Sequence, residues 1–247
     1  MADAAAAAGA AGAAEVAEIA ARWLDALQRV AGRAAHEINN ALNGAVVNLE
    51  VVRLRAVPGK DAGAAAPFAQ AGAGQLEGAV RFVEALTGLT RAPRGAPDAA
   101  ATLRQLATLL APVAAHDGVT LHVEAELAAP TSAPAAAVRW ALAETLLVAI
   151  EAARAAAPVT GAESLEVPAE NPIPAAGVGG LDGALPAPAA ARVVRCVLHV
   201  APDPTVRVHG PASVHLAGDA LDVLRTCGID VGYEGPTLIL AFPPIVG

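Results

Sequence analysis

The chain has 247 residues, of which 55% are hydrophobic and only 2% aromatic, so its core must be built mostly from alanine, valine and leucine. Sixteen basic and 24 acidic residues give a net charge of -8, which argues against a nucleic-acid or anionic-membrane surface. No charge-free apolar run is long enough for a membrane span, so we expect a cytoplasmic protein. The two cysteines, Cys196 and Cys227, lie far apart in ordinary apolar patterns and are predicted to be buried thiols.

The first helix is expected to be unusually long. Residues 1–14 form an Ala/Gly run without the basic start of a secretory signal, and we expect a disordered tail there. From Ala13 to Val57 no proline interrupts a helical pattern of apolar residues that includes Val16, Ile19, Trp23, Leu27 and Val30. Such a helix would span roughly 65 Å, too long to stand alone.

At the centre of this helix lies the run His36-Glu37-Ile38-Asn39-Asn40-Ala41-Leu42-Asn43-Gly44. A helical step of 100° places Asn40, Asn43 and Val47 in a stripe around His36, and puts apolar residues on the far side. Imidazole is a nitrogen nucleophile that titrates near neutrality, so it can pass on a phosphoryl group if a carboxylate takes its proton. A solvated His-Glu pair without chemistry is the competing interpretation of these residues alone.

In this order the residues resemble the H-box of the dimerisation and histidine phosphotransfer domain of two-component sensor histidine kinases. Members of that family commonly read His-Glu-Ile-Asn-Asn-Pro-Leu. Ala41 stands in place of the proline, which removes a possible helix kink but none of the chemical groups.

A second helix is expected over 65–90, after a turn at 58–63. Together the two helices predict an antiparallel hairpin over 15–92 with an apolar stripe on each arm. Two copies would cover these stripes by forming a dimeric four-helix bundle, which the resemblance also implies. The alternative is a bundle formed within one chain by later helices.

The remaining residues, 98–247, predict a small α/β sandwich, which makes the whole chain α+β. Asp98 can cap a helix over 99–115. The later pattern predicts a strand at 119–126, a helix at 134–157, a loop at 158–188, a strand at 191–200, a helix at 212–227, and a hairpin of strands at 229–234 and 237–242. This order resembles the catalytic, ATP-binding domain of histidine kinases.

The residues that such a domain uses for ATP are missing. Glu144 and Val148 stand where the resemblance places two asparagines, and a valine offers no oxygen to magnesium. Glu151, on a neighbouring turn, points elsewhere. Asp203 is followed by Pro204 and Thr205 instead of the family's glycines, and the last glycine box is reduced to residues 215–219. We therefore expect a degenerate domain that binds neither ATP nor a metal of its own.

These observations predict a histidine phosphotransfer protein that works with response regulator receiver domains. His36 would exchange a phosphoryl group with a receiver aspartate, Glu37 would accept the ring proton or orient the ring, and Asn40 would bind the phosphoryl group or a water. The receiver would bring its own magnesium and lysine. Docking is expected at Asn43, Gly44, Val47, Arg81 and Glu84.

Three alternatives remain open at this stage. The protein could be a silent scaffold that binds a receiver, a divergent autokinase, or a receiver phosphatase that depends on Asn40 more than on His36.

Overall fold

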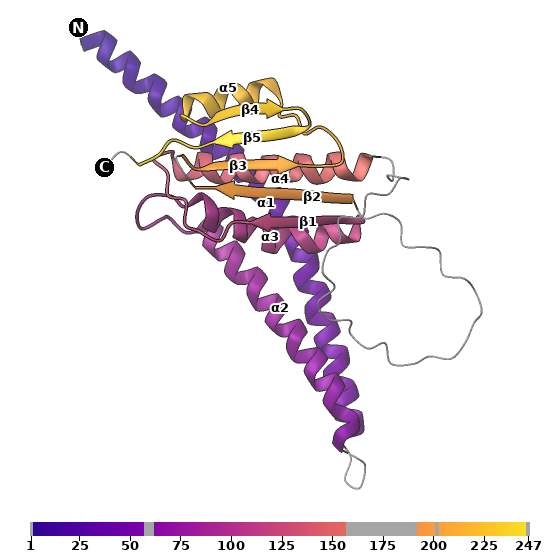
Figure 1. Ribbon diagram of the computed structural model, residues 1–247. Coiled ribbons are helices and arrows are strands. Elements are labelled where there is room, and N and C mark those ends of the chain that lie inside the picture. The colour runs from indigo at the N-terminus through magenta and orange to yellow at the C-terminus, as the bar shows by residue number, and fades with distance from the viewer. Residues whose placement is uncertain (1, 57–61, 157–191, 201–202, 246–247) are drawn as a thin grey trace.

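The computed structural model describes residues 2–56, 62–156, 192–200 and 203–245, and shows a long helical hairpin beside a small α/β unit (Figure 1). Most of the turn expected at 58–63 and all of the loop expected at 158–188 lie outside these ranges. The elements are α1 (Ala2–Arg55), a 3-10 turn η1 (Ala62–Ala65), α2 (Ala66–Thr90), α3 (Ala99–His116), β1 (Val119–Glu124), α4 (Ala135–Ala155), β2 (Arg192–His199), β3 (Thr205–His209), α5 (Gly218–Thr226), β4 (Asp230–Glu234) and β5 (Thr237–Ala241). No helix in the described part is both long and apolar enough to cross a membrane.

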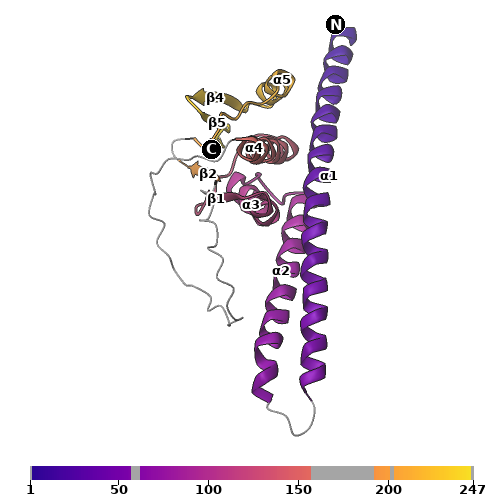
Figure 2. The same ribbon diagram turned by 90° about the vertical axis from the view of Figure 1, so that its right-hand side faces the viewer.

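Helix α1 is the longest element and extends well past the end of α2, alongside the α/β unit (Figure 2). Its 54 residues correspond to about 80 Å. It begins at Ala2, so the expectation of a disordered tail over 1–14 is wrong for residues 2–14. Alanine has the most favourable helix propensity, and an Ala-rich run continues a helix that is already formed.

The two arms of the hairpin approach closely because small residues face each other. Ala45 of α1 and Gly72 and Ala79 of α2 are buried between them. A Cβ atom placed on Gly72 would lie 3.4 Å from the Cβ of Asn48. The Asn48 amide donates hydrogen bonds of 3.0 Å to the Gly44 carbonyl and to Gln75 Oε1, which ties the two arms together.

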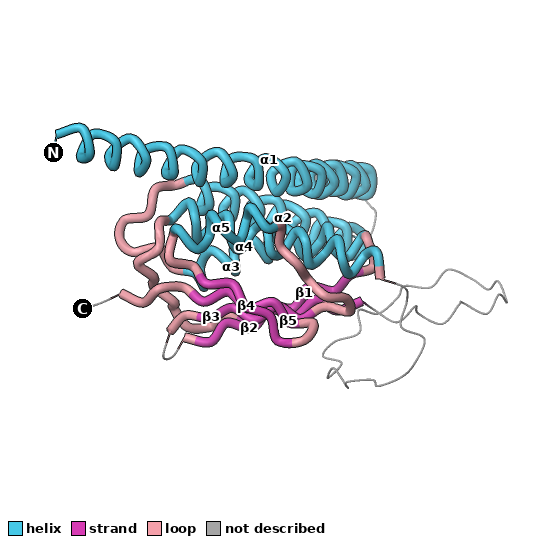
Figure 3. The backbone as a smooth tube through the Cα atoms, turned by 90° about the horizontal axis from the view of Figure 1, so that it is seen from above, coloured by secondary structure: helices cyan, strands magenta, loops and turns pink. Residues whose placement is uncertain are grey.

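The sheet has the strand order β1-β2-β3-β5-β4, with β1 and β2 parallel and all other pairs antiparallel. Helices α3 and α4 cover one face of it, and α1 lies behind them, as the view from above shows (Figure 3). The predicted mixed sheet with helices on one face is therefore confirmed.

The last third of the chain differs from the expectation in two places. Strand β3 was not predicted, because only five residues separate Pro204 from Gly210 and their alternation is too short to stand out. Val206 and Val208 are nevertheless buried, with Arg207 between them on the open face. The helix expected from residue 212 begins at Gly218, since Val214 and Leu216 enter the core from an irregular segment.

The core lies between α3, α4 and the sheet, and it is leucine-rich. Leu103, Leu106, Leu109 and Leu110 of α3 are all fully buried. Asp98 caps α3 as predicted, accepting a 2.9 Å hydrogen bond from the Ala100 backbone N–H. Both cysteines are buried as expected, and burial raises the pKa of the Cys196 thiol to about 12.

We predict that Leu106→Ala lowers the free energy of unfolding by about 2–5 kcal/mol, because it leaves a cavity in this core. Leu127→Ala is the matched control, since Leu127 is 68% exposed whereas Leu106 is completely buried. Urea unfolding followed by circular dichroism would measure both variants. Equal losses would show that the α3 face does not form the core.

Candidate functional site

The stripe around His36 is open to solvent over its whole length. His36, Asn40 and Asn43 are exposed, and the side chain of Val47 continues the same stripe with 63% of its surface exposed. No group of three or more His, Cys, Asp or Glu side chains suited to a metal occurs in the described residues. The site thus presents one nucleophilic ring and two amides.

Glu37 does not share this stripe, although it follows His36 in the chain. One helical step turns its side chain toward α3, where it is only 11% exposed. Its Oε1 atom lies 3.2 Å from Nδ1 of His116, the last residue of α3, whose own side chain is 62% exposed. The α/β unit therefore supplies a partner to the carboxylate beside the candidate nucleophile. Nothing in the spacing of the sequence indicates His116, because the two residues meet only in the folded chain.

Gly44 also lies away from the open stripe. A Cβ atom on this glycine would come within 2.4 Å of the Gln75 amide of α2, so Gly44 allows close packing inside the hairpin. Arg81 and Glu84 of α2 are exposed, as a docking surface requires. The structure thus leaves Asn43, Val47, Arg81 and Glu84 accessible, whereas Gly44 contacts the other arm.

The N-terminal half of α1 packs on α4. Arg29 contacts α4, and Arg22 reaches α5. Arg29 pairs with Asp25 at 3.1 Å and with Glu144 of α4. Arg22 donates a 3.0 Å hydrogen bond to Asp219 of α5, which holds the pKa of that carboxyl below its usual range. The guanidinium of Arg22 also lies 5.2 Å from the centre of a Trp140 ring. Glu144 is thus engaged by α1.

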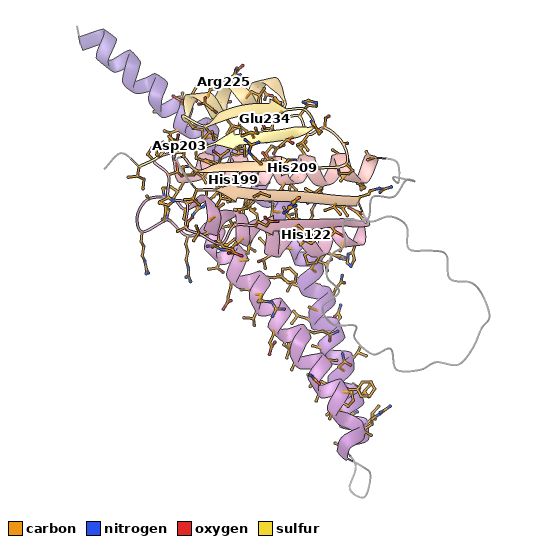
Figure 4. All side chains as sticks on the ribbon, in the orientation of Figure 1. His122, His199, Asp203, His209, Arg225 and Glu234 are labelled. Atoms are coloured by element: carbon orange, nitrogen blue, oxygen red, sulfur yellow. The ribbon has the colours of Figure 1, made fainter. Side chains whose placement is uncertain are left out.

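A cleft of about 370 Å³ remains between α1 and α4. It is lined by Arg29 and Arg33 of α1 and by Leu147, Val148, Glu151, Ala152 and Ala155 of α4. The labelled histidines His122, His199 and His209 belong to the sheet strands and lie apart from the hairpin stem (Figure 4).

Comparison with known proteins gives no match among family models and none among curated proteins. Among solved structures, a bacterial phosphotransferase is 13% identical, covers 88% of this chain and 95% of its own, and gives a TM-score of 0.38. A histidine kinase domain from the blue-light-activated histidine kinase of Erythrobacter litoralis is 18% identical, covers 79% and 93%, and gives 0.35. At these TM-scores the likeness assigns no activity, so function has to be proposed from the site itself.

We predict that removing one or the other partner of the Glu37–His116 contact lowers the free energy of unfolding by different amounts. His116→Ala leaves a nearly buried carboxylate without its partner and should cost about 1–3 kcal/mol, whereas Glu37→Gln releases an exposed imidazole to water and should cost less. Urea unfolding of the two single variants and the double variant would measure the coupling. His122→Ala, an exposed histidine on β1, is the control. The reverse ranking would contradict the assigned contact.

Proposed function

We propose that this protein is a histidine phosphotransferase that relays a phosphoryl group between His36 and the aspartate of response regulator receiver domains. The observation that carries the proposal is the exposed His36 ring on a stripe with Asn40, Asn43 and Val47, accessible to another protein. It rests also on the order of the residues His36 to Gly44, which resembles the H-box.

In the proposed transfer, one bond to phosphorus forms and one breaks, and no cofactor bound to this chain takes part. A nitrogen of His36 attacks the phosphorus of the receiver's aspartyl phosphate, a nitrogen–phosphorus bond forms, and the oxygen–phosphorus bond breaks to release the receiver carboxylate. The proton of the second ring nitrogen passes to water, since the Glu37 carboxylate is turned toward His116 of α3. Asn40, one turn further along the helix, donates a hydrogen bond to the phosphoryl oxygens. Magnesium belongs to the receiver in this proposal, where it neutralises the developing charge.

Two features of α4 support the view that the phosphate does not come from ATP. The Glu144 carboxylate is paired with Arg29 of α1, so it is already engaged at the position where the family presents an asparagine to magnesium. Val148, at the second such position, lines the cleft with an apolar side chain.

The same proposal includes a homodimer formed by the hairpin stem. Both arms expose large apolar side chains at helical spacing, on a surface that the described residues leave uncovered: Leu42, Val46 and Leu49 on α1, and Leu76, Val80 and Val83 on α2. A second copy would bury these stripes in a four-helix bundle and leave the His36 stripe, on a different side of α1, free for the receiver.

We predict that His36→Gln abolishes transfer of label from a phosphorylated receiver, because glutamine has no nucleophilic ring nitrogen. The measurement mixes the purified protein with a panel of radiolabelled receivers and follows label on both proteins. His122→Gln on the open sheet face is the matched control and should transfer normally.

Each alternative function gives a different result in this assay. Transfer that persists in His36→Gln would rule out the assigned nucleophile. Binding without exchange would indicate a scaffold, and loss of receiver label that depends on Asn40 but not on His36 would indicate a phosphatase. Label taken up from magnesium-ATP would indicate an autokinase.

We further predict that the double variant Val46→Asp with Val80→Asp is monomeric, because two charges cannot be buried in the apolar interface. Sedimentation velocity should show half the mass of the wild type, with helix content kept. Leu127→Asp, on an exposed loop residue, should remain dimeric. A monomeric wild-type protein would contradict the bundle.

A further inference from the structure

Arg33 occupies an unusual position in the cleft between α1 and α4. It is half-buried, yet it makes no hydrogen bond or ion pair within the described residues. Arg29, one turn earlier and lining the same cleft, is held by the carboxylates of Asp25 and Glu144. Arg33 therefore has all five N–H donors of its guanidinium available, next to a cavity, in a chain with a net charge of -8.

The helix places this guanidinium beside the candidate nucleophile. Residues three apart are neighbours on a helix surface, with Cβ atoms about 5–6 Å apart. Both side chains lean toward the N-terminus of α1, so the His36 ring lies over the turn that carries Arg33, and the long Arg33 side chain has to extend back along the helix surface to meet it. A phosphoryl group on that ring would come within reach of a flexible arginine side chain on the same side of α1.

The wall of the cleft strengthens such an interaction. Leu147, Val148, Ala152 and Ala155 present apolar surface, which lowers the local dielectric and favours a charge-assisted hydrogen bond over hydration. The one carboxylate in the lining, Glu151, is paired with Arg154 at 2.7 Å, which offsets its repulsion of an anion.

We propose that Arg33 is a phosphoryl-binding residue: its guanidinium holds the oxygens of the phosphoryl group as it arrives at His36 and while His36 carries it. Arginine suits this role because its planar fork matches two oxygens of one phosphoryl group. The inference rests on the proposed function, since it takes His36 as the phosphorylated residue. It adds an anion site to which the α/β unit contributes one wall.

Phosphoramidate tests this site without a receiver, because it phosphorylates histidine directly. A ring nitrogen attacks phosphorus, the nitrogen–phosphorus bond of phosphoramidate breaks, and ammonia leaves. The rate of His36 phosphorylation is measured against phosphoramidate concentration, and the half-life of the phosphohistidine is then measured in EDTA. Arg33→Ala should raise the half-saturating concentration roughly ten- to hundredfold. Arg33→Lys should recover part of this loss, because it restores the charge without the fork.

Matched controls separate binding from folding. Arg94→Ala removes an arginine that is exposed and, like Arg33, has no ion-pair partner among the described residues; it lies in the segment between α2 and α3 and should behave as wild type. The unfolding midpoint of Arg33→Ala should stay close to that of the wild type, because Arg33 makes no hydrogen bond or ion pair within the described residues.

The outcomes distinguish this inference from the proposed function. If Arg33→Ala has the same half-saturating phosphoramidate concentration and the same phosphohistidine half-life as the wild type, the role of Arg33 is overturned and the relay is unaffected. A wild-type protein that phosphoramidate does not phosphorylate at His36 would overturn the inference as well. Phosphorylation that depends on Arg33, in a protein that exchanges phosphate with no receiver, would uphold the anion site and reject the relay.

Discussion

The packing of α1 against three other helices is the constraint on which the rest of the structure depends. Each residue turns the side chain by 100°, so neighbours in sequence face different partners. Ala45 and Asn48 face α2, Glu37 faces α3, and Arg29 faces α4. What remains exposed is the stripe of His36, Asn40, Asn43 and Val47.

The energetics of this arrangement come from burial more than from charge. Ile19, Ala26, Val30 and Ala34 of α1 are buried and join the main core, and each contributes about 25 cal/mol for every Å² of apolar surface removed from water. The ion pairs of Arg22 and Arg29 are partly exposed, and such pairs typically contribute less than about 1 kcal/mol each. Their effect is on orientation, because they fix which turn of α1 meets α4 and α5.

The sequence predicted the elements with sustained periodicity and missed those defined by tertiary contacts. The hairpin, α3, α4 and β2 follow patterns long enough to read directly, and the Asp98 cap was visible from its position. Strand β3 was missed because five residues carry little periodic signal, and it exists because β2 and β5 pair with it on both sides.

The residues of the candidate site fall into the same two groups, those predictable from periodicity and those defined by tertiary contacts. The exposure of His36, Asn40, Asn43 and Val47 follows from helical geometry alone and agrees with the structure. The surroundings of Glu37 and Gly44 do not, because His116 and Gln75 are distant in sequence and reach them only through folding. The state of Arg33 is likewise invisible in the sequence, because it depends on Arg29 being paired with Asp25 and Glu144 in the fold while Arg33 is not paired by any described residue.

Glu144 and Val148 of α4 can be understood together with the position of α1. An asparagine at 148 would place an amide in a wall that is apolar in this chain, while at 144 the carboxylate gives Arg29 an anionic partner. Once Arg29 is engaged by Glu144, Arg33 is the arginine of this cleft that is left to bind an anion. The proposed anion site therefore uses the arginine of this cleft that the described residues leave unpaired, facing apolar side chains of α4.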